Sequence, residues 1–280
     1  MICLLSNALN VLDEEGRAEV LRFAINEQNP DGGFKDRAGR SDLYYSLFGM
    51  VILKGIEGME QGAGGMEKGF KESIQRLKQY IDGMAVSQVP GFIERCCLVL
   101  IQKELKAKRS SLLKSLFLLA KSSWKERSSI NLSYRSFVLF LTLDAVFPIS
   151  GIIKRSAHRI LAYNNLDEHS PCSEVAAKIF LRKWMNQKDP VEEKLLLSFA
   201  CLSGGFKAFP MLNHADMLST AVALYSLRYA GTDLRTLKPS NLEYIQSNYS
   251  GGAFLSGDGD MITDVEYTFY GLLALGTLAD

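Results

Sequence analysis

Apolar residues recur at spacings of three and four along almost the whole chain, which is the spacing of one buried helix face. No stretch alternates apolar and polar residues between hairpin turns, so the pattern predicts no strand. Turn and capping residues between the apolar stretches predict twelve helices. They lie near residues 13–27, 42–55, 66–83, 90–106, 110–124, 132–146, 150–164, 172–187, 190–202, 215–230, 234–248 and 263–278. The expected class is all-α.

A Gly-Gly-Phe turn followed by an aspartate and an apolar helix occurs three times. The copies are Gly32-Gly-Phe34 with Asp42, Gly204-Gly-Phe206 with Asp216, and Gly251-Gly-Ala-Phe254 with Asp264. The glycines permit a tight turn, the phenylalanine can pin it to the core, and the aspartate can cap free backbone N–H groups. We therefore expect Asp42 and Asp216 to act first as structural caps.

Alternate helices begin at intervals of about 40–48 residues, the period of helical-hairpin repeats that bury their faces only against neighbours. The best-matched copies are the first and the last two, so the two ends of the chain carry compatible partners. The predicted fold is an α/α toroid of six helical hairpins around a central cavity, with residues 1–280 as a single domain. In such a ring the inner helices begin at one edge, where residues after each aspartate can face a common cavity.

Composition and charge narrow the function. A chain of 280 residues with 47% hydrophobic content suffices for a sizeable core. The formal net charge of +1 gives no field that would attract nucleic acid, and no apolar run approaches the roughly 20 residues of a membrane span. Five cysteines without a CxxC pair favour reduced thiols in a cytoplasm. Any ligand preference must therefore be local.

The repeats resemble those of the prenyltransferase and squalene-cyclase family. The segment from Gly32 to Gly49 is most similar to repeats in the β subunits of Rab geranylgeranyltransferases, and Asp264-Val-Glu-Tyr267 is similar to their Asp-Val-Cys-Tyr segment. The similarity covers roughly 90 residues in three repeats, and residues 85–190 lack the Gly-Gly-Phe turn. The resemblance implies an aromatic-lined cavity for an isoprenoid chain, and it is compatible with a helical partner subunit.

The zinc site of the protein prenyltransferases is altered at two of its three positions. The resemblance places the zinc-binding aspartate at Asp264, with Glu266 where the cysteine stands and Tyr45 where the histidine stands. Because the soft thiolate and imidazole ligands are gone, this set suits a hard cation such as magnesium better than zinc. A family-type zinc site is therefore not expected.

The positions that bind diphosphate in the family are altered as well. Asp258 and Met261 stand where the family has arginine and lysine. An acidic loop repels a diphosphate unless a cation bridges the two. Cationic residues that could rebuild an anion site are Lys35, Arg37, Arg40, Arg95 and Arg135. For Lys35 and Arg37 the alternative is a solvated loop position.

The cyclase branch of the family protonates its substrate with the central acid of an Asp-x-Asp-Asp-Thr-Ala segment. Asp216-Met-Leu-Ser-Thr-Ala221 has Leu218 at the donor position, so this copy cannot supply the acid. In the last copy Glu266 takes that position and is the best candidate for a general acid, with Asp264 and Tyr267 beside it. The alternative is a structural glutamate in the first turn of a helix, where the dipole favours it.

Candidates for substrate binding come from the repeats that should adjoin in the ring. Aromatic side chains that can line an apolar tunnel or stabilise a cation are Tyr44, Tyr45, Phe48, Tyr267, Phe269 and Tyr270. Packing between the inner helices is the alternative explanation. His214 stands two residues before Asp216, at a helix start that should face the cavity, and is the first histidine to test.

Two functions remain open from the sequence. One is an enzyme of the prenyltransferase or terpene-cyclase type that acts on an isoprenoid. The other is a binding or scaffold toroid that has lost the zinc and diphosphate sites. A thioester-containing toroid is a weaker third alternative, because the Gly-Cys-Gly-Glu-Gln segment that it needs is absent.

Overall fold

The computed structural model describes residues 1–57, 64–125, 132–146, 166 and 169–279. Most of these residues are helical, which confirms the all-α prediction. The helices are α1 (Ile2–Val11), α2 (Glu14–Asn26), α3 (Leu43–Glu57), α4 (Gly64–Gly83), α5 (Phe92–Glu104), α6 (Arg109–Lys125), α7 (Leu132–Val146), α9 (Cys172–Trp184), α10 (Pro190–Leu197), α11 (Met217–Ala230), α12 (Lys238–Ser247) and α13 (Val265–Leu278), with a 3₁₀ turn η1 (Val86–Gln88). Two antiparallel strand pairs join β1 (Phe34–Lys35) to β2 (Ser41–Asp42) and β3 (Tyr249–Ser250) to β4 (Ala253–Phe254).

The predicted helices agree with the structure apart from their ends, and the one predicted at 150–164 lies outside the described residues. Two expectations are wrong. Helix α1 was not predicted, because its buried stripe of Leu5, Ala8 and Leu9 is too short to establish a period. The expectation of no strands missed β1 to β4, because strands of two residues cannot show an alternating pattern.

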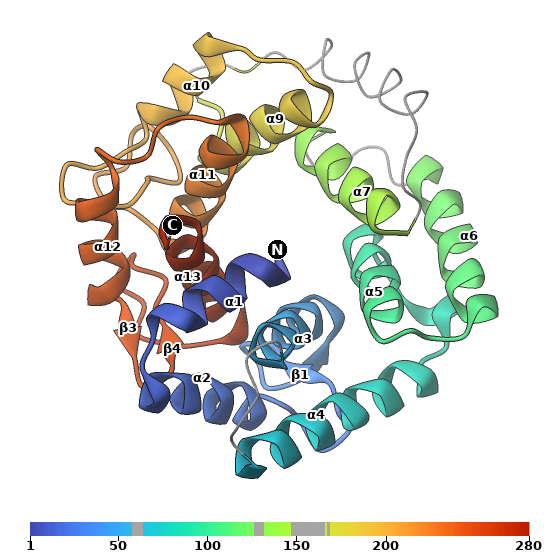
Figure 1. Ribbon diagram of the computed structural model, residues 1–280. Coiled ribbons are helices and arrows are strands. Elements are labelled where there is room, and N and C mark those ends of the chain that lie inside the picture. Colours follow the sequence, from blue (N-terminus) through green and yellow to red (C-terminus); the bar gives the residue numbers. More distant parts are fainter. Residues whose placement is uncertain (58–63, 126–131, 147–165, 167–168, 280) are drawn as a thin grey trace.

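Figure 1 shows the odd-numbered helices around the centre of the molecule and the even-numbered helices outside them. Along the inner set, α3 packs on α5, α5 on α7, α7 on α9, α9 on α11 and α11 on α13. Helix α13 then packs back on α3. The series of contacts between inner helices therefore returns to its start.

The three Gly-Gly-Phe copies build the same local corner. In each, the backbone N–H of a buried phenylalanine donates to a hydroxyl four residues after the aspartate: Phe34 to Ser46, Phe206 to Thr220 and Phe254 to Thr268. Each aspartate also accepts backbone N–H bonds from the first turn of its helix. The predicted capping roles of Asp42 and Asp216 are thereby confirmed.

In each copy, the glycine two residues before the phenylalanine brings the loop against the backbone of an outer helix. Gly32, Gly204 and Gly252 have φ values of 95°, 91° and 87°, which L side chains rarely adopt. A Cβ on them would lie 2.2 Å from the carbonyl oxygen of Arg76 in α4, 2.0 Å from that of Ser240 in α12 and 2.4 Å from that of Glu19 in α2. The third contact joins the last repeat to the first outer helix in the same way as the other two.

Helix α1 covers the junction between the first and last repeats. A Cβ on Gly276 of α13 would lie 1.8 Å from the carbonyl oxygen of Leu4, so α1 approaches the backbone of α13 very closely. On its other side, Ser6 donates a hydrogen bond to the carbonyl of Gly55 in α3 at 3.0 Å. Helix α1 therefore ties α13 to α3 from the inside.

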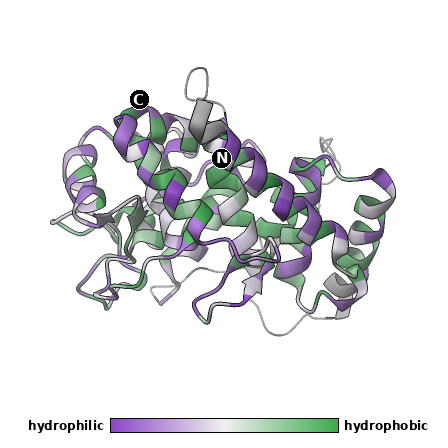
Figure 2. Cartoon of the chain, turned by 90° about the horizontal axis from the view of Figure 1, so that it is seen from below, coloured by the Kyte–Doolittle hydropathy of each residue, from purple (hydrophilic) through white to green (hydrophobic). Residues whose placement is uncertain are grey.

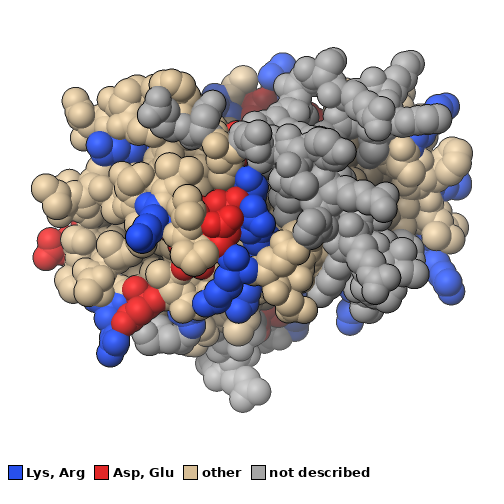
Figure 3. Space-filling view, turned by 90° about the horizontal axis from the view of Figure 1, so that it is seen from above, with Lys and Arg blue, Asp and Glu red and all other residues tan. Residues whose placement is uncertain are grey.

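The helices are amphipathic, and charges of both signs lie on one face of the molecule. Seen from below, apolar and polar residues lie side by side along the helices, as expected for amphipathic elements (Figure 2). Seen from above, acidic side chains lie among basic ones (Figure 3). Within the described part of the chain, none of the helices has the length and apolar character needed to cross a membrane.

Candidate functional site

The corner between α3 and α13 brings together most of the predicted site. Asp264 is only 3% exposed, and its Oδ2 accepts a hydrogen bond from Nε of Arg37 at 2.9 Å. The Arg37 guanidinium also donates to Asp260 at 2.7 Å. It lies over the ring of Tyr267, 5.2 Å from the centroid. A cation from the first repeat thus neutralises a buried carboxylate of the last repeat.

Glu266 lies in the first turn of α13 and is held by α3. The Tyr44 hydroxyl donates to its Oε1 at 2.8 Å, and Tyr45 forms a further hydrogen bond with it. Burial raises the pKa of Glu266 above its ordinary value of 4.5, and the charge of Asp264 raises it too, although both tyrosines lower it. Glu266 therefore holds a proton more tightly than a solvated glutamate does.

The neighbouring tyrosines stay protonated. Burial raises the pKa of Tyr45, and the charge of Glu266 adds to this effect. The same two causes raise the pKa of Tyr267 to about 12. Around neutral pH both hydroxyls therefore keep their protons, and Tyr45 can donate a hydrogen bond to Glu266 after that carboxyl loses its proton.

An aromatic group continues from this corner along α3 and α13. Tyr44 meets Phe48 edge to face with centroids 4.6 Å apart, and Phe48 contacts Phe269 at 4.8 Å and Tyr270 at 5.5 Å. Phe48 and Tyr270 are buried, whereas Tyr44 and Tyr45 are half-buried. The inner rings therefore pack between the two helices, and the tyrosine pair presents the accessible part of the group.

The other predicted cationic residues have different positions. Lys35 in β1 pairs with Glu27 at 3.0 Å, and Arg40, whose side chain is 80% exposed, pairs with Asp36 at 3.1 Å. Arg95 in α5 donates to the carbonyl of Val89 at 3.0 Å. Arg135 lies in α7, and its side chain falls outside the described residues. Lys35, Arg37 and Arg40 each have a carboxylate partner, which reduces the charge they offer to a diphosphate.

Asp216 begins the equivalent corner of the second repeat. Its Oδ1 caps α11 through the N–H of Ser219 at 2.8 Å, while its buried Oδ2 has no hydrogen-bond partner among the described residues. Burial raises the pKa of Asp216, and the charge of Asp258 also raises it. His214 is exposed, and it exerts an electrostatic influence on both Asp216 and Asp258. In the described part of the chain, this corner thus holds two carboxylates and no arginine that pairs with them.

The donor set does not fit a zinc site of the family type. Glu266, Asp264 and Tyr45 do lie near one another at this corner, since the charge of Asp264 raises the pKa of both Glu266 and Tyr45. However, Asp264 is already paired with Arg37, and among the described residues no group of three or more His, Cys, Asp and Glu side chains is placed to hold a metal ion. A cation at this corner would have to displace the Arg37 guanidinium first.

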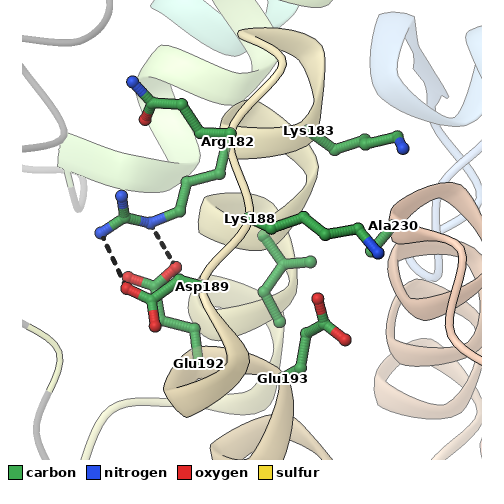
Figure 4. Close-up of a pocket in the computed structure, with 9 residues that line it drawn as sticks. Arg182, Lys183, Lys188, Asp189, Glu192, Glu193 and Ala230 are labelled. Atoms are coloured by element: carbon green, nitrogen blue, oxygen red, sulfur yellow. Dashed lines mark hydrogen bonds and ion pairs between the residues drawn. The ribbon is translucent and has the colours of Figure 1, made fainter.

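A small charged cleft lies elsewhere, between α9, α10 and the end of α11 (Figure 4). Arg182 bonds to both Asp189 and Glu192 there, and Glu192 also pairs with the buried Lys178 at 3.0 Å. Its cavity volume of about 10 Å³ leaves room for about one water molecule, far below the roughly 300–1,000 Å³ of most small-molecule sites. These charges mainly fix α10 onto α9.

Sequence reasoning missed two residues of the corners. Asp260 shares the Arg37 guanidinium with Asp264, although its acidic loop was interpreted only as repulsive to a diphosphate. Gly257 lies against Tyr244 of α12, whose hydroxyl would be 2.0 Å from a Cβ at that position. The spacing from the repeat phenylalanine could have shown that Arg37 and Gly257 are equivalent, since each follows its phenylalanine by three positions.

Comparison with known proteins does not assign the chain to a family. A scan against protein-family models gives no match, and a search of curated proteins finds no similar sequence. The functional interpretation therefore depends on the geometry of the α3–α13 corner.

Proposed function

We propose that the chain is an α/α toroid of six helical hairpins, of the terpenoid-cyclase and prenyltransferase type, which binds an isoprenoid-like molecule at its centre. The series of inner-helix contacts that returns to α3 supports the ring, as do the three equivalent loop contacts with outer helices. The aromatic group on α3 and α13 supplies an apolar wall next to Glu266. All five cysteines are free, which supports a reducing compartment such as the cytoplasm.

The raised pKa of Glu266 beside the Tyr44 hydroxyl is the observation that carries the proposed chemistry. In the proposed step, the Glu266 carboxyl gives its proton to an alkene carbon of the isoprenoid. The alkene π electrons form the new C–H bond, and a carbocation develops on the adjacent carbon. Faces of Tyr44, Tyr45 and Tyr267 stabilise that cation. Loss of a proton from the cation to the carboxylate gives a rearranged alkene and restores the acid.

Asp264 and Arg37 have supporting roles in this proposal. The charge of Asp264 favours the protonated form of Glu266, while the Arg37 guanidinium offsets that charge and fixes the start of α13 beside the first repeat. Prenyl transfer from a diphosphate is less well supported, because Lys35, Arg37 and Arg40 are paired with carboxylates.

The experiment is to incubate the purified chain with polyprenols and to identify products by mass spectrometry. Glu266→Gln keeps an acceptor for the Tyr44 hydroxyl but has no proton to donate, so turnover should fall about 10²–10⁴-fold. Glu243→Gln, at an exposed position on α12, is the matched control and should act as the wild type. Unchanged turnover in Glu266→Gln would remove Glu266 from the proposed mechanism.

A binding or scaffold toroid without chemistry is the second candidate. The pairing of Lys35, Arg37 and Arg40 with carboxylates favours it, as does the altered zinc set at Tyr45 and Glu266. This candidate predicts that an added isoprenoid binds and is recovered unchanged from the wild type and from Glu266→Gln alike. Any measured turnover decides against it.

A further inference from the structure

Two neighbouring loops, residues 206–216 and 255–264, expose four large apolar side chains. These are Phe209 (40% exposed), Met211 (64%), Met261 (76%) and Ile262 (57%), and we name them the loop-tip surface. The loops run side by side, because the N–H of Met217 donates to the carbonyl of Ser256 at 2.7 Å. The buried Phe206 and Phe254 anchor the two loops in the core. The two anchored, neighbouring loops thus expose apolar side chains that another molecule can cover.

The loop-tip surface lies in an acidic part of the chain. Residues 200–216 and 248–266 contain five carboxylates and a single lysine or arginine, Lys207. Asp264 is buried against Arg37, and burial raises the pKa of Asp216 and Glu266, so the charge at the surface comes mainly from Asp258 and Asp260. The Ser256 hydroxyl holds the pKa of the exposed Asp258 below its usual range, so Asp258 is ionised at neutral pH. Arg37 reaches in from the first repeat and offsets part of this charge. A partner for this surface should combine apolar and cationic side chains.

Helix α6 has this combination. It exposes Leu113 (51%) and Phe117 (70%), which lie one helical turn apart on the same face. Residues 103–121 contain one carboxylate, Glu104, and six cations: Lys103, Lys106, Lys108, Arg109, Lys114 and Lys121. Figure 1 places α6 across the ring from α12, on whose backbone the second Gly-Gly-Phe loop packs. One chain therefore carries two complementary surfaces on opposite sides.

We propose that the chain associates with itself head to tail, with α6 of one copy seated on the loop-tip surface of the next. Leu113 and Phe117 would be removed from water against Met211 and Met261, and methionine side chains adapt readily to a helix face. The lysines of α6 meet the carboxylates around Asp258, which aligns the two copies. Because the two surfaces differ, the contact is heterologous, and copies add in a row.

The size of the two surfaces sets the strength of this contact. A few apolar side chains on each surface fit the small, transient class of interface, below the roughly 1,200 Å² of stable ones. Much of the attraction is between exposed charges, so added salt should weaken it. The association goes beyond the proposed function and does not depend on it.

A membrane matches the loop-tip surface less well than α6 does. An anionic bilayer would be repelled by the carboxylates around Met261. A neutral bilayer would gain the apolar contacts alone and would take the charged Asp258 partly out of water at a cost. Helix α6 of a second copy satisfies both the apolar and the acidic part of the surface.

The experiment is sedimentation velocity of the full chain over a concentration series. The wild type should show a mass that rises with protein concentration and falls as salt is added. Lys114→Glu combined with Phe117→Ser disables the α6 surface, and Asp258→Lys combined with Met261→Ser disables the loop-tip surface. Each double variant alone should associate at least about tenfold more weakly than the wild type. Val191→Ser, at a position 75% exposed on α10, is the matched control and should associate normally.

Mixing the two double variants gives the decisive result. Each keeps one intact surface, so the mixture should form a one-to-one dimer and nothing longer. The proposal is overturned if the wild type stays monomeric, if either double variant associates normally, if the mixture forms no dimer, or if the wild type binds phosphatidylcholine vesicles instead of itself. Circular-dichroism melts confirm that the variants fold. No isoprenoid is present, so this result is independent of the proposed chemistry at Glu266.

Discussion

Asp264 and Asp216 occupy equivalent positions at the starts of α13 and α11, yet among the described residues an arginine pairs with Asp264 and none with Asp216. Both cap their helices, and in both repeats a hydroxyl four residues later binds the N–H of a buried phenylalanine. Asp264 is paired with Arg37, whereas the buried Oδ2 of Asp216 has no hydrogen-bond partner in the part of the chain that the structure describes. The scaffold of the repeat is therefore conserved between the two corners of this one chain, and the charge is not.

The two corners differ at one position, which lies three residues after the phenylalanine of the neighbouring repeat. Arg37, three residues after Phe34, reaches Asp264, and the equivalent residue three positions after Phe254 is Gly257. An arginine could not replace Gly257 without strain, because its φ is 86° and a Cβ would lie 2.0 Å from the Tyr244 hydroxyl. The glycine at position 257 thus leaves the Asp216 corner without a counterpart of the Arg37 ion pair.

The largest loss of stability should come from removing the buried phenylalanine that the corners share. Phe34→Ala, Phe206→Ala and Phe254→Ala each remove a fully buried ring and should lower the free energy of unfolding by about 3–5 kcal/mol. Urea denaturation measures the loss. Phe209→Ala, on an exposed loop, is the control and should cost less than about 1 kcal/mol. A small cost at one of the three anchors would show that the corners are not equivalent.

The next largest effect should come from Arg37, whose charge distinguishes the Asp264 corner from the Asp216 corner. Arg37→Ala leaves Asp264 buried without its cation and should lower the free energy of unfolding by about 1–3 kcal/mol, a range reduced because Arg37 is itself 38% exposed. Arg40→Ala removes only a solvated ion pair and should have a much smaller effect. Thermal and urea unfolding of the two variants measure the difference. Equal losses would mean that the Arg37 pair does not stabilise the corner.

Asparagine at the two capping positions should change the free energy of unfolding in opposite directions. Asn still accepts the capping hydrogen bond, so Asp264→Asn loses mainly its attraction to Arg37 and should destabilise by about 1–2 kcal/mol. Asp216→Asn removes a largely buried charge that has no ion pair like that of Arg37 among the described residues, and should be neutral or stabilising by up to about 1 kcal/mol at neutral pH. The free energies of unfolding of both variants measure this. A clear loss of stability in Asp216→Asn would contradict the comparison.

The smallest expected effect is a pH dependence of the difference in stability between Asp216→Asn and the wild type. The pKa of Asp216 is raised above 3.8 in the folded state, so its protonated form stabilises the fold below the unfolded pKa. This contribution is lost as the pH rises through the folded pKa. The stability of Asp216→Asn relative to the wild type should therefore grow as the pH rises from about 3.8, which urea titrations at several pH values measure. A constant difference would mean that the pKa is not raised.

Much of the fold could be predicted from the sequence, because the helical period and the Gly-Gly-Phe repeat both depend on neighbouring residues. Asp42 and Asp216 were predicted as caps from such local signals, and the structure confirms them. Helix α1 escaped prediction because its stability comes from close packing against Gly276 and Gly55 rather than from a long periodic pattern.

The candidate site was predictable only in part. Convergence of Tyr44, Tyr45 and Glu266 follows from the expected adjacency of the first and last repeats. The pairing of Arg37 with Asp264 depends on how a loop folds 227 residues away in sequence, and no local pattern encodes that contact. Asp216 likewise receives no arginine from the next loop because Gly257 stands at the position equivalent to Arg37, and this correspondence joins repeats that are distant in sequence.

The most direct test of the central claim is the titration of Glu266 itself. Carbon-13 NMR of the glutamate carboxyl groups, compared between the wild type and Glu266→Gln, assigns its signal and follows it with pH. The account predicts a Glu266 pKa above 4.5, because burial beside Asp264 favours the protonated carboxyl that the proposed reaction needs. A Glu266 pKa at or below 4.5 would contradict that account.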